Sequence, residues 1–131
     1  MIITDRKQAE EKLKLAASVF THAREAIIIT DDIAFIIDVN QAFIRRTGFS
    51  HEEIIGRNPN FLQSDKHSSE LSPQIWQALQ KNGYWCGEIC NRRKNGEEYT
   101  EMVAISAACD KNGIPTHFVV LGNDITHMKE H

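Results

Sequence analysis

The chain has 131 residues, of which 41% are hydrophobic and 25% charged, and this composition is typical of one globular domain. Its formal net charge of −3 is not that of a nucleic-acid-binding surface, so we expect no nucleic-acid partner. The longest strongly apolar run, Ala26 to Thr30, is far shorter than the roughly 20 residues of a membrane span. No signal peptide precedes Asp5-Arg6-Lys7, so we expect a cytoplasmic module with no direct membrane contact.

The cysteines Cys86, Cys90 and Cys109 suit a reducing compartment better than a disulfide scaffold. Cys86 and Cys90 fall in a predicted strand, which places them on one face but roughly 13 Å apart. That separation is too large for two ligands of one tetrahedral metal ion. We therefore expect buried, apolar cysteines and no metal site.

The N-terminal segment from Asp5 to Phe20 is rich in helix-forming residues. Its small and apolar residues recur in a heptad-like stripe, namely Ala9, Leu13, Ala16 and Phe20. An isolated helix of this length is marginal in water, so it must pack on its own domain or pair with a second copy. We expect residues 1–20 to form a linker helix and the stripe to form a homodimer seam.

Two β-type runs, at residues 26–30 and 35–39, are separated by Asp31-Asp32 and predict a hairpin. Short helices follow. Asn40 caps one over residues 41–46, and Ser50 with Glu53 forms a capping box for another that ends at Gly56.

A longer helix is predicted over residues 68–81, and Pro73 places its start near Ser72. Three strands complete the chain, at residues 85–93, 98–109 and 116–124, with turns at Asn95-Gly96 and Lys111-Asn112-Gly113. Both faces of the last strand are apolar, so the sheet needs a cover on each face. The short helices are expected on one face, and the N-terminal helix or a partner chain on the other.

This order of elements resembles the PAS fold. The motifs that carry the resemblance are Asn40-Gln41-Ala42-Phe43, Thr47-Gly48-Phe49, Glu52-Glu53-Ile54-Ile55-Gly56, Trp85-Cys86-Gly87-Glu88, Asn91-Arg92-Arg93-Lys94-Asn95-Gly96 and Asp124-Ile125-Thr126. The resemblance implies an α+β fold with a five-stranded antiparallel sheet in the order 2-1-5-4-3. It implies a PAS domain over residues 21–126 and the start of a connecting helix at 127–131.

The two ends of the chain resemble the exits of successive PAS modules, in Ile3 to Glu10 and in Asp124 to Lys129. We therefore expect a PAS/PAC sensory-box module of a bacterial multidomain signalling protein. The resemblance implies an output domain in the same chain: a diguanylate cyclase of the GGDEF type, a phosphodiesterase or a histidine kinase. Such proteins act in cyclic-di-GMP or two-component signalling. The sequence itself carries no catalytic motif, so we expect no enzyme activity and no catalytic residue in this module.

The segment Gly56-Arg57-Asn58-Pro59-Asn60-Phe61-Leu62-Gln63-Ser64 resembles the core motif of the LOV photosensors, a flavin-binding branch of the PAS group. Pro59 stands where that branch has its reactive cysteine, and Asn60 where it has a phosphate-binding arginine. Gly122 stands where its last strand offers a glutamine to the flavin ring. These departures make FMN an unlikely cofactor, and Asn58 and Leu62 are expected to line a pocket wall.

Trp85, Asn91 and Glu101 resemble positions in the flavin-dependent redox-sensing PAS domains that regulate nitrogen fixation, which leaves FAD possible. A two-residue Asn95-Gly96 turn would pair Asn91 with Thr100, whereas a three-residue loop with a bulge would pair it with Glu101. The flavin hypothesis needs the second register. Alternatively, Asn91 and Glu101 bond each other or water.

Haem is an unlikely cofactor, because His67 lies in the polar helix entry Lys66-His67-Ser68-Ser69 and is better explained as an exposed histidine. Three functions therefore remain open. The module is a sensor of a small molecule or redox state that signals through its C-terminal helix, a ligand-free dimerisation and relay domain, or an FAD-binding redox sensor.

Overall fold

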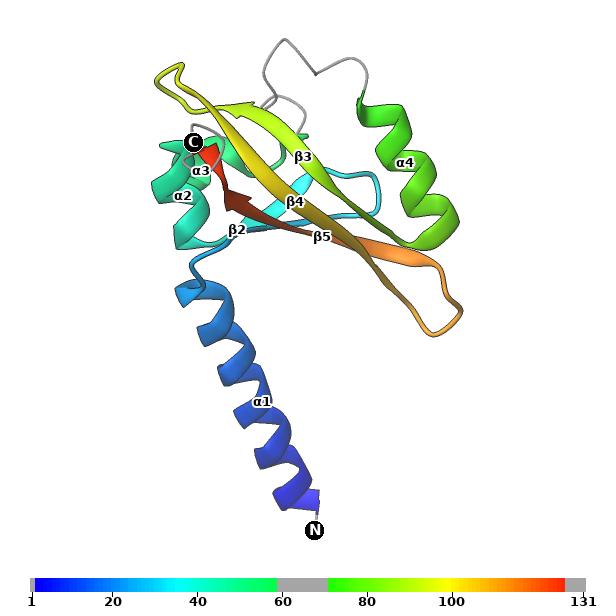
Figure 1. Cartoon of the computed structure of the whole chain (residues 1–131). Coiled ribbons are helices and arrows are strands. Elements are labelled where there is room, and N and C mark those ends of the chain that lie inside the picture. The colour runs from blue at the N-terminus through cyan, green and yellow to red at the C-terminus, as the bar shows by residue number, and fades with distance from the viewer. Residues whose placement is uncertain (1, 59–70, 127–131) are drawn as a thin grey trace.

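Five strands form one antiparallel sheet in the order β2-β1-β5-β4-β3 in the computed structural model of the protein, which describes residues 2–58 and 71–126 (Figure 1). The elements are α1 (Ile2–His22), β1 (Ala26–Thr30), β2 (Ile36–Val39), α2 (Gln41–Thr47), α3 (His51–Ile54), α4 (Leu71–Asn82), β3 (Tyr84–Arg92), β4 (Glu98–Cys109) and β5 (Pro115–Asp124). This α+β architecture and strand order confirm the predicted fold.

The helices α2, α3 and α4 cover one face of the sheet, and two apolar clusters lie beneath them. Under α2 and α3, the cluster is Ala26, Ile28, Ile36, Val39, Phe43 and Ile54. Under α4, it is Ile75, Leu79, Ile89, Val103 and Phe118. Val120, on the central strand β5, packs against both clusters. The two groups of helices are therefore held at opposite ends of the inner sheet face.

Local capping signals fix the short helices as predicted. The Asn40 side chain accepts hydrogen bonds from the backbone N–H of Phe43 at 3.1 Å and of Ile27 at 3.0 Å, and so ties α2 to β1. Ser50 and Glu53 form a reciprocal capping box at the start of α3. Helix α4 includes Ser72, near which its start was predicted.

Helix α1 projects away from the sheet (Figure 1) and is longer than the predicted segment. Leu13, in its predicted stripe, is 72% exposed. The outer face of the sheet consequently keeps exposed apolar side chains, among them Tyr84, Met102 and Leu121. Of the two covers expected for this face, α1 of the same chain is ruled out in this arrangement, and a partner chain stays a prediction.

The register of β3 against β4 differs from both predicted registers. Asn91 pairs with Tyr99, and Glu101 pairs with Ile89. The reason lies at the hairpin tip, where Arg93 N–H donates to the Glu97 carbonyl at 2.8 Å and leaves a three-residue loop, Lys94 to Gly96. The pairing is therefore shifted one residue from a two-residue turn, in the direction opposite to the predicted bulge.

The prediction of buried cysteines was wrong. Cys86 and Cys109 are exposed and Cys90 is partly exposed. Cys86 and Cys90 alternate with the inward-pointing Ile89 and Asn91, so they lie on the outer face, which none of the described helices covers.

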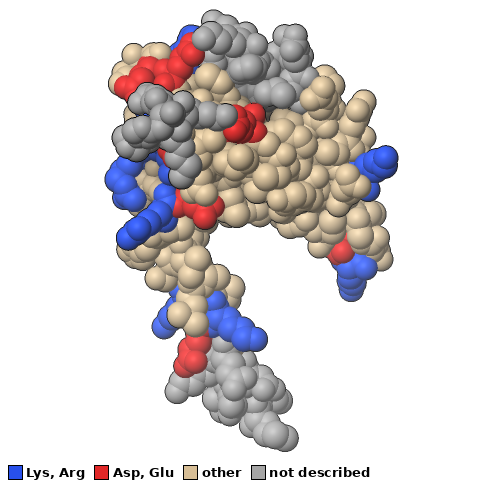
Figure 2. Space-filling model, viewed as in Figure 1, with Lys and Arg blue, Asp and Glu red and all other residues tan. Residues whose placement is uncertain are grey.

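None of the helices in the described part of the chain has the length and hydropathy of a membrane span. Positively charged side chains are scattered at the edges of the domain and along α1 on the face seen in Figure 2. The predicted connecting helix, at residues 127–131, lies outside the described residues.

Candidate ligand pocket

A cavity of about 110 Å³ lies between the sheet and the helices. Its described lining is mostly apolar: Ala26, Ile28, Ala34, Phe43, Ile75, Trp76, Leu79, Ile89, Val103, Ile105, Phe118 and Val120. The polar side chains in this lining are Thr30, Asn58, Asn91 and Glu101, and Gly122 contributes backbone. An apolar cavity with a few convergent polar groups is the usual form of a small-molecule site.

Asn91 and Glu101 form the polar end of the cavity, and each is only 7% exposed. They sit diagonally across β3 and β4, and Asn91 Nδ2 donates to Glu101 Oε1 at 2.7 Å. The observed contact is therefore the alternative in which the two side chains bond each other. It removes most of the cost of burying them, because an unsatisfied buried polar group costs about 1–3 kcal/mol.

Arg46, in the last turn of α2, holds the other oxygen of this carboxylate. Its Nη1 donates to Glu101 Oε2 at 2.9 Å and to the Gly122 carbonyl at 2.6 Å. Its Nη2 donates to the Arg24 carbonyl at 3.2 Å, in the segment between α1 and β1. One arginine thus joins the pocket carboxylate to β5 and to the exit of the N-terminal helix.

Gly122 allows Glu101 to occupy this position. A Cβ at residue 122 would lie 2.4 Å from Glu101 Oε2, closer than real Cβ contacts allow. The space above this strand position is therefore filled from β4 by the Glu101 carboxylate. The close approach explains why the position holds a glycine.

A second arginine continues the hydrogen bonds to the end of β5. Arg93 Nη1 donates to the Arg46 carbonyl at 2.5 Å, and Nη2 donates to Asp124 Oδ2 at 2.9 Å. Burial raises the pKa of Asp124, but hydrogen bonds from Thr126 and Arg93 outweigh it and hold the pKa below its usual range. Arg93 also stacks over the Tyr99 ring at 4.2 Å, and burial raises the pKa of that phenol.

Thr126 fastens the chain where it leaves β5. The backbone N–H of Thr100 donates to Thr126 Oγ1 at 2.8 Å, and the Thr126 N–H donates to Asp124 Oδ1 at 3.0 Å. The hydrogen-bonded series from Glu101 through Arg46 and Arg93 therefore reaches the last described residues of the chain.

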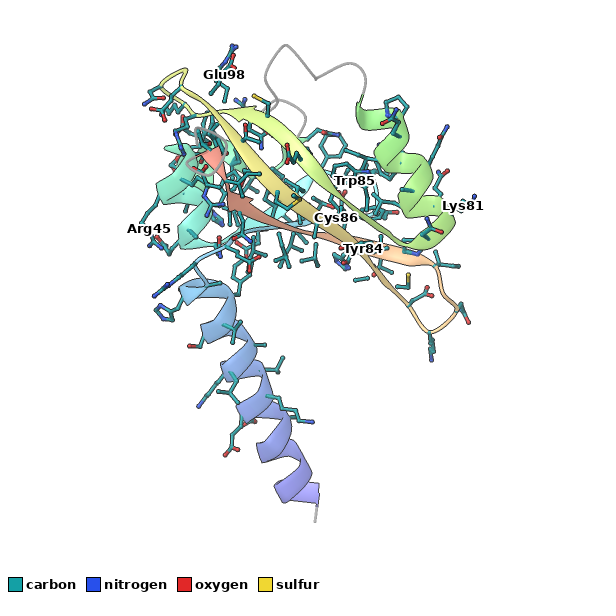
Figure 3. All side chains as sticks on the ribbon, viewed as in Figure 1. Arg45, Lys81, Tyr84, Trp85, Cys86 and Glu98 are labelled. Atoms are coloured by element: carbon teal, nitrogen blue, oxygen red, sulfur yellow. The ribbon has the colours of Figure 1, made fainter. Side chains whose placement is uncertain are left out.

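The structure brings together three of the predicted pocket residues, since Asn58, Asn91 and Glu101 all line the cavity. Trp85 is on the inner face of β3 (Figure 3), but it packs on the cluster beneath α4 and over Gly87, and it is absent from the described lining. Leu62 lies outside the described residues, as do Pro59, Asn60 and His67. That these side chains bind a ligand stays a prediction.

Sequence reasoning missed Arg46, Thr30 and the contact between Gly122 and Glu101. The available signal for Arg46 was its spacing: it follows Phe43 by three positions, which places a cation beside the buried side of a short helix. Its partner is 55 residues away in sequence, so no local pattern connects them. Among the described residues, no group of three His, Cys, Asp or Glu side chains is placed to hold a metal ion.

Known proteins resemble this chain in sequence and in structure. The nitrogen fixation regulatory protein of Klebsiella oxytoca is 33% identical over 104 residues, which cover 79% of this chain and 21% of that protein. A blue-light-activated histidine kinase of Rhizobium johnstonii is 26% identical, over 96% of this chain and 37% of that protein. The chain therefore spans a minor part of these relatives.

Among solved structures, the crystal structure of the PAS domain of a protein from Colwellia psychrerythraea superposes with a TM-score of 0.83 at 28% identity. The match covers 88% of this chain and 98% of that one. The family model described as PAS domain matches residues 24–127, which is most of the chain. The cavity and its sheet therefore lie in a chain that belongs to the PAS domain family.

Proposed function

We propose that this module is a sensor that binds a small molecule in the cavity and relays its occupancy to an output domain of the same polypeptide. The observation that carries the proposal is the buried Asn91–Glu101 pair, which ends an apolar cavity and is tied by Arg46 to β5. Ionisable side chains are rarely buried at such a point unless they are paired or functional. The module itself needs no catalytic residue for this role.

The relay would act through competition for Glu101. A ligand that bonds to the carboxylate weakens its pairing with Arg46, and Arg46 also holds the carbonyls of Gly122 and Arg24. A change in the position of Arg46 therefore alters its hydrogen bonds to β5 and to the segment between α1 and β1. Such a switch requires that the ligand has different affinities for the two arrangements.

The test is to purify the protein without denaturation, release any bound molecule with denaturant and identify it by mass spectrometry. A stoichiometric molecule that is absent from an Asn91→Leu variant of equal stability supports the sensor. Trp76 lines the cavity, so its fluorescence reports rebinding when it is measured in a Trp85→Phe variant, which removes the second tryptophan of the chain. A protein that carries no molecule, and whose Trp76 fluorescence is unchanged by cell extract metabolites, contradicts the sensor.

A second candidate is a ligand-free relay that works by dimerisation. The observation that favours it is that α1 leaves Leu13, Leu15 and Val19 exposed, while the described part of the chain also leaves the outer sheet face uncovered. We propose a homodimer through Ala9, Leu13, Ala16 and Phe20. The dimer then carries a change at Arg24 into two paired helices. A mutation in the stripe that abolishes the dimer and leaves the cavity unchanged separates this function from ligand sensing.

A flavin is the most specific ligand that the resemblance suggests, and FAD is our second alternative. Asn91 and Glu101, the polar residues on which that suggestion rests, share the cavity wall. The cavity of about 110 Å³ is smaller than the roughly 300–1,000 Å³ of most ligand sites, so a tricyclic ring would require lining side chains to move. A colourless native preparation, with no flavin released on denaturation, contradicts this alternative.

For the output domain we favour a histidine kinase, because one relative is a histidine kinase that the chain matches over 37% of its length. A diguanylate cyclase or a phosphodiesterase as the output domain stays a prediction. The cytoplasmic location, the absence of a nucleic-acid partner, and the exclusion of FMN and haem also stay predictions. Sequencing the coding region downstream of residue 131 identifies the output domain directly.

A further inference from the structure

We infer that the pocket selects an uncharged, flat aromatic heterocycle that presents an N–H donor to Glu101. This inference rests on the proposed sensing function and narrows its ligand to a chemical class. It follows from which hydrogen-bonding groups at the polar end are already used and which remain.

The orientation of the Asn91 amide is fixed by its neighbour. A carboxylate that is paired with a guanidinium only accepts hydrogen bonds, so the amide nitrogen must face Glu101, as the 2.7 Å contact from Nδ2 to Oε1 shows. The carbonyl oxygen of Asn91 then points away from Glu101. Of the two amide hydrogens, one is donated to Glu101 and the other has no acceptor among the described residues.

The other hydrogen-bonding groups on the sheet wall of the cavity are acceptors. Thr30 lies away from the polar end, opposite Phe118 in the register of β1 and β5, and its hydroxyl hydrogen is donated to the Asp31 carbonyl at 2.9 Å, which leaves the hydroxyl oxygen as an acceptor there. The Glu101 oxygens have further lone pairs, since each accepts one hydrogen bond from the described residues. Acceptors therefore outnumber donors on the sheet wall, and the strongest is a carboxylate.

The charge of this wall is already balanced. Arg46 Nη1 lies 2.9 Å from Glu101 Oε2, and its remaining contacts are to the backbone carbonyls of Gly122 and Arg24. A cationic ligand at Glu101 would meet the guanidinium of Arg46, and an anion would meet the carboxylate. An uncharged donor avoids both costs.

The rest of the cavity favours an aromatic ring. Trp76 and Phe118 form an edge-to-face pair with centroids 5.4 Å apart, and both line the cavity together with aliphatic side chains from α4 and the sheet. A cavity of about 110 Å³ has room for a ligand of one or two small rings rather than an extended one. The charged acceptor lies at one end of the cavity, on Glu101, so the ligand needs its N–H donor on the edge that faces this end.

The test compares indole with benzofuran, which have the same shape but carry N–H and O at the same ring position. Both are titrated into the natively folded chain, freed of any bound molecule, by calorimetry. Hydrogen bonds to charged groups are strong enough that we expect indole to bind at least about tenfold more tightly than benzofuran. Equal binding, tighter benzofuran or no binding of either probe overturns the inference.

Two variants test whether the preference for indole over benzofuran comes from Glu101. Glu101→Gln keeps the shape but replaces the charged acceptor, so the ratio of the two dissociation constants should fall several-fold. Glu88→Gln removes an equivalent charge from an exposed position on the other face of β3 and should leave the ratio unchanged. Should Glu101→Gln fail to fold, the wild-type comparison alone still decides.

The inference and the proposed function fail separately. A molecule released from the native protein that lacks an N–H or other donor overturns the inference and leaves the sensor standing. No released molecule and no binding of any probe overturns both.

Discussion

Arg46 and Glu101 are 55 residues apart in sequence and form an ion pair of 2.9 Å whose side chains are only 14% and 9% exposed. The pair joins the last turn of α2 to the first half of β4. Breaking a buried pair from one side is costly because it strands the remaining charge, whereas an exposed pair contributes little. Arg46 is therefore predicted to matter more for folding than its neighbours on the same helix.

Replacing Arg46 by methionine should lower the free energy of unfolding by about 3 kcal/mol, because Glu101 is left buried without its cation. The matched control is Arg45→Met, since Arg45 is the adjacent residue on α2 but is exposed, and it should change stability by no more than about 0.5 kcal/mol. Urea denaturation followed by circular dichroism measures both. Similar effects for the two variants would show that the Arg46–Glu101 pair carries no special stability.

Adding a methyl group at Gly122 should displace the Glu101 carboxylate, since a Cβ there would lie 2.4 Å from Oε2. We expect Gly122→Ala to destabilise the protein by about 1–3 kcal/mol, the usual cost of overpacking. In a Glu101→Ala background, Gly122→Ala should lower the free energy of unfolding much less, because the carboxylate that would collide with the new methyl group is absent. A double-mutant cycle measured by chemical denaturation gives this coupling, and additive effects would contradict it.

The lowered pKa of Glu53 predicts that the protein loses stability in acid. The Lys94 hydrogen bond, with those from Ser50, lowers the pKa of Glu53 from 4.5 to about 2. A lowered pKa contributes stability that is present above 4.5 and is lost as the pH falls toward about 2. In Lys94→Met, the thermal midpoint should fall less across this interval than in the wild type.

Lys111→Met is the control for the acid experiment, because it removes a lysine charge from the exposed turn before β5. Its midpoint should follow the wild-type pH dependence. An unchanged pH profile for Lys94→Met would mean that the Lys94–Glu53 pair, with Nζ to Oε2 at 2.8 Å, is not formed in solution.

The proposed dimer predicts that Leu13→Asp converts the protein to a monomer, because a charge would be buried in the helix seam. Ser18→Asp introduces the same charge on the opposite side of α1 and should leave the dimer intact. Analytical ultracentrifugation over a concentration series distinguishes the two. A monomeric wild type, or two variants that dissociate alike, contradicts the seam.

Short-range signals made the helices and strands predictable from the sequence. Asn40 and the Ser50–Glu53 box mark helix starts through hydrogen bonds that span three residues, and the structure contains both. The strand order came from the PAS resemblance, and the order in the structure is the same. The positions of the helices and strands along the chain could therefore be predicted without knowledge of long-range contacts. The order of the strands in the sheet needed the family resemblance.

The register of β3 against β4 needed knowledge of long-range contacts. The Asn95-Gly96 dipeptide favours a two-residue turn, but here Gly96 is the last residue of a three-residue loop, with a φ of +93°. The backbone N–H of Lys94 donates to the Thr47 carbonyl at 2.8 Å, so α2 holds the loop from outside the hairpin. The sequence of the hairpin alone gives no indication of the contact between Lys94 and Thr47.

The candidate site was predictable in part for the same reason. Asn91 and Glu101 were found because they resemble positions in flavin-dependent PAS domains, and both line the cavity. Arg46 was missed because its partners come from three distant segments. The cysteines were misplaced because an apolar strand face was assumed to be covered, and residues 2–58 and 71–126 leave the outer sheet face open.

The packing of Glu101 against Gly122 also makes this pocket incompatible, as it stands, with the glutamine that the LOV resemblance would place at position 122. A Cβ there would lie 2.4 Å from Glu101 Oε2, so any side chain at 122 requires the carboxylate to leave its present place. Arg46, which donates to this carboxylate and to the Gly122 carbonyl, would then lose its partner. A side chain at residue 122 and the Arg46–Glu101 ion pair are thus alternatives, and the size of this one residue decides which of them closes the polar end of the pocket.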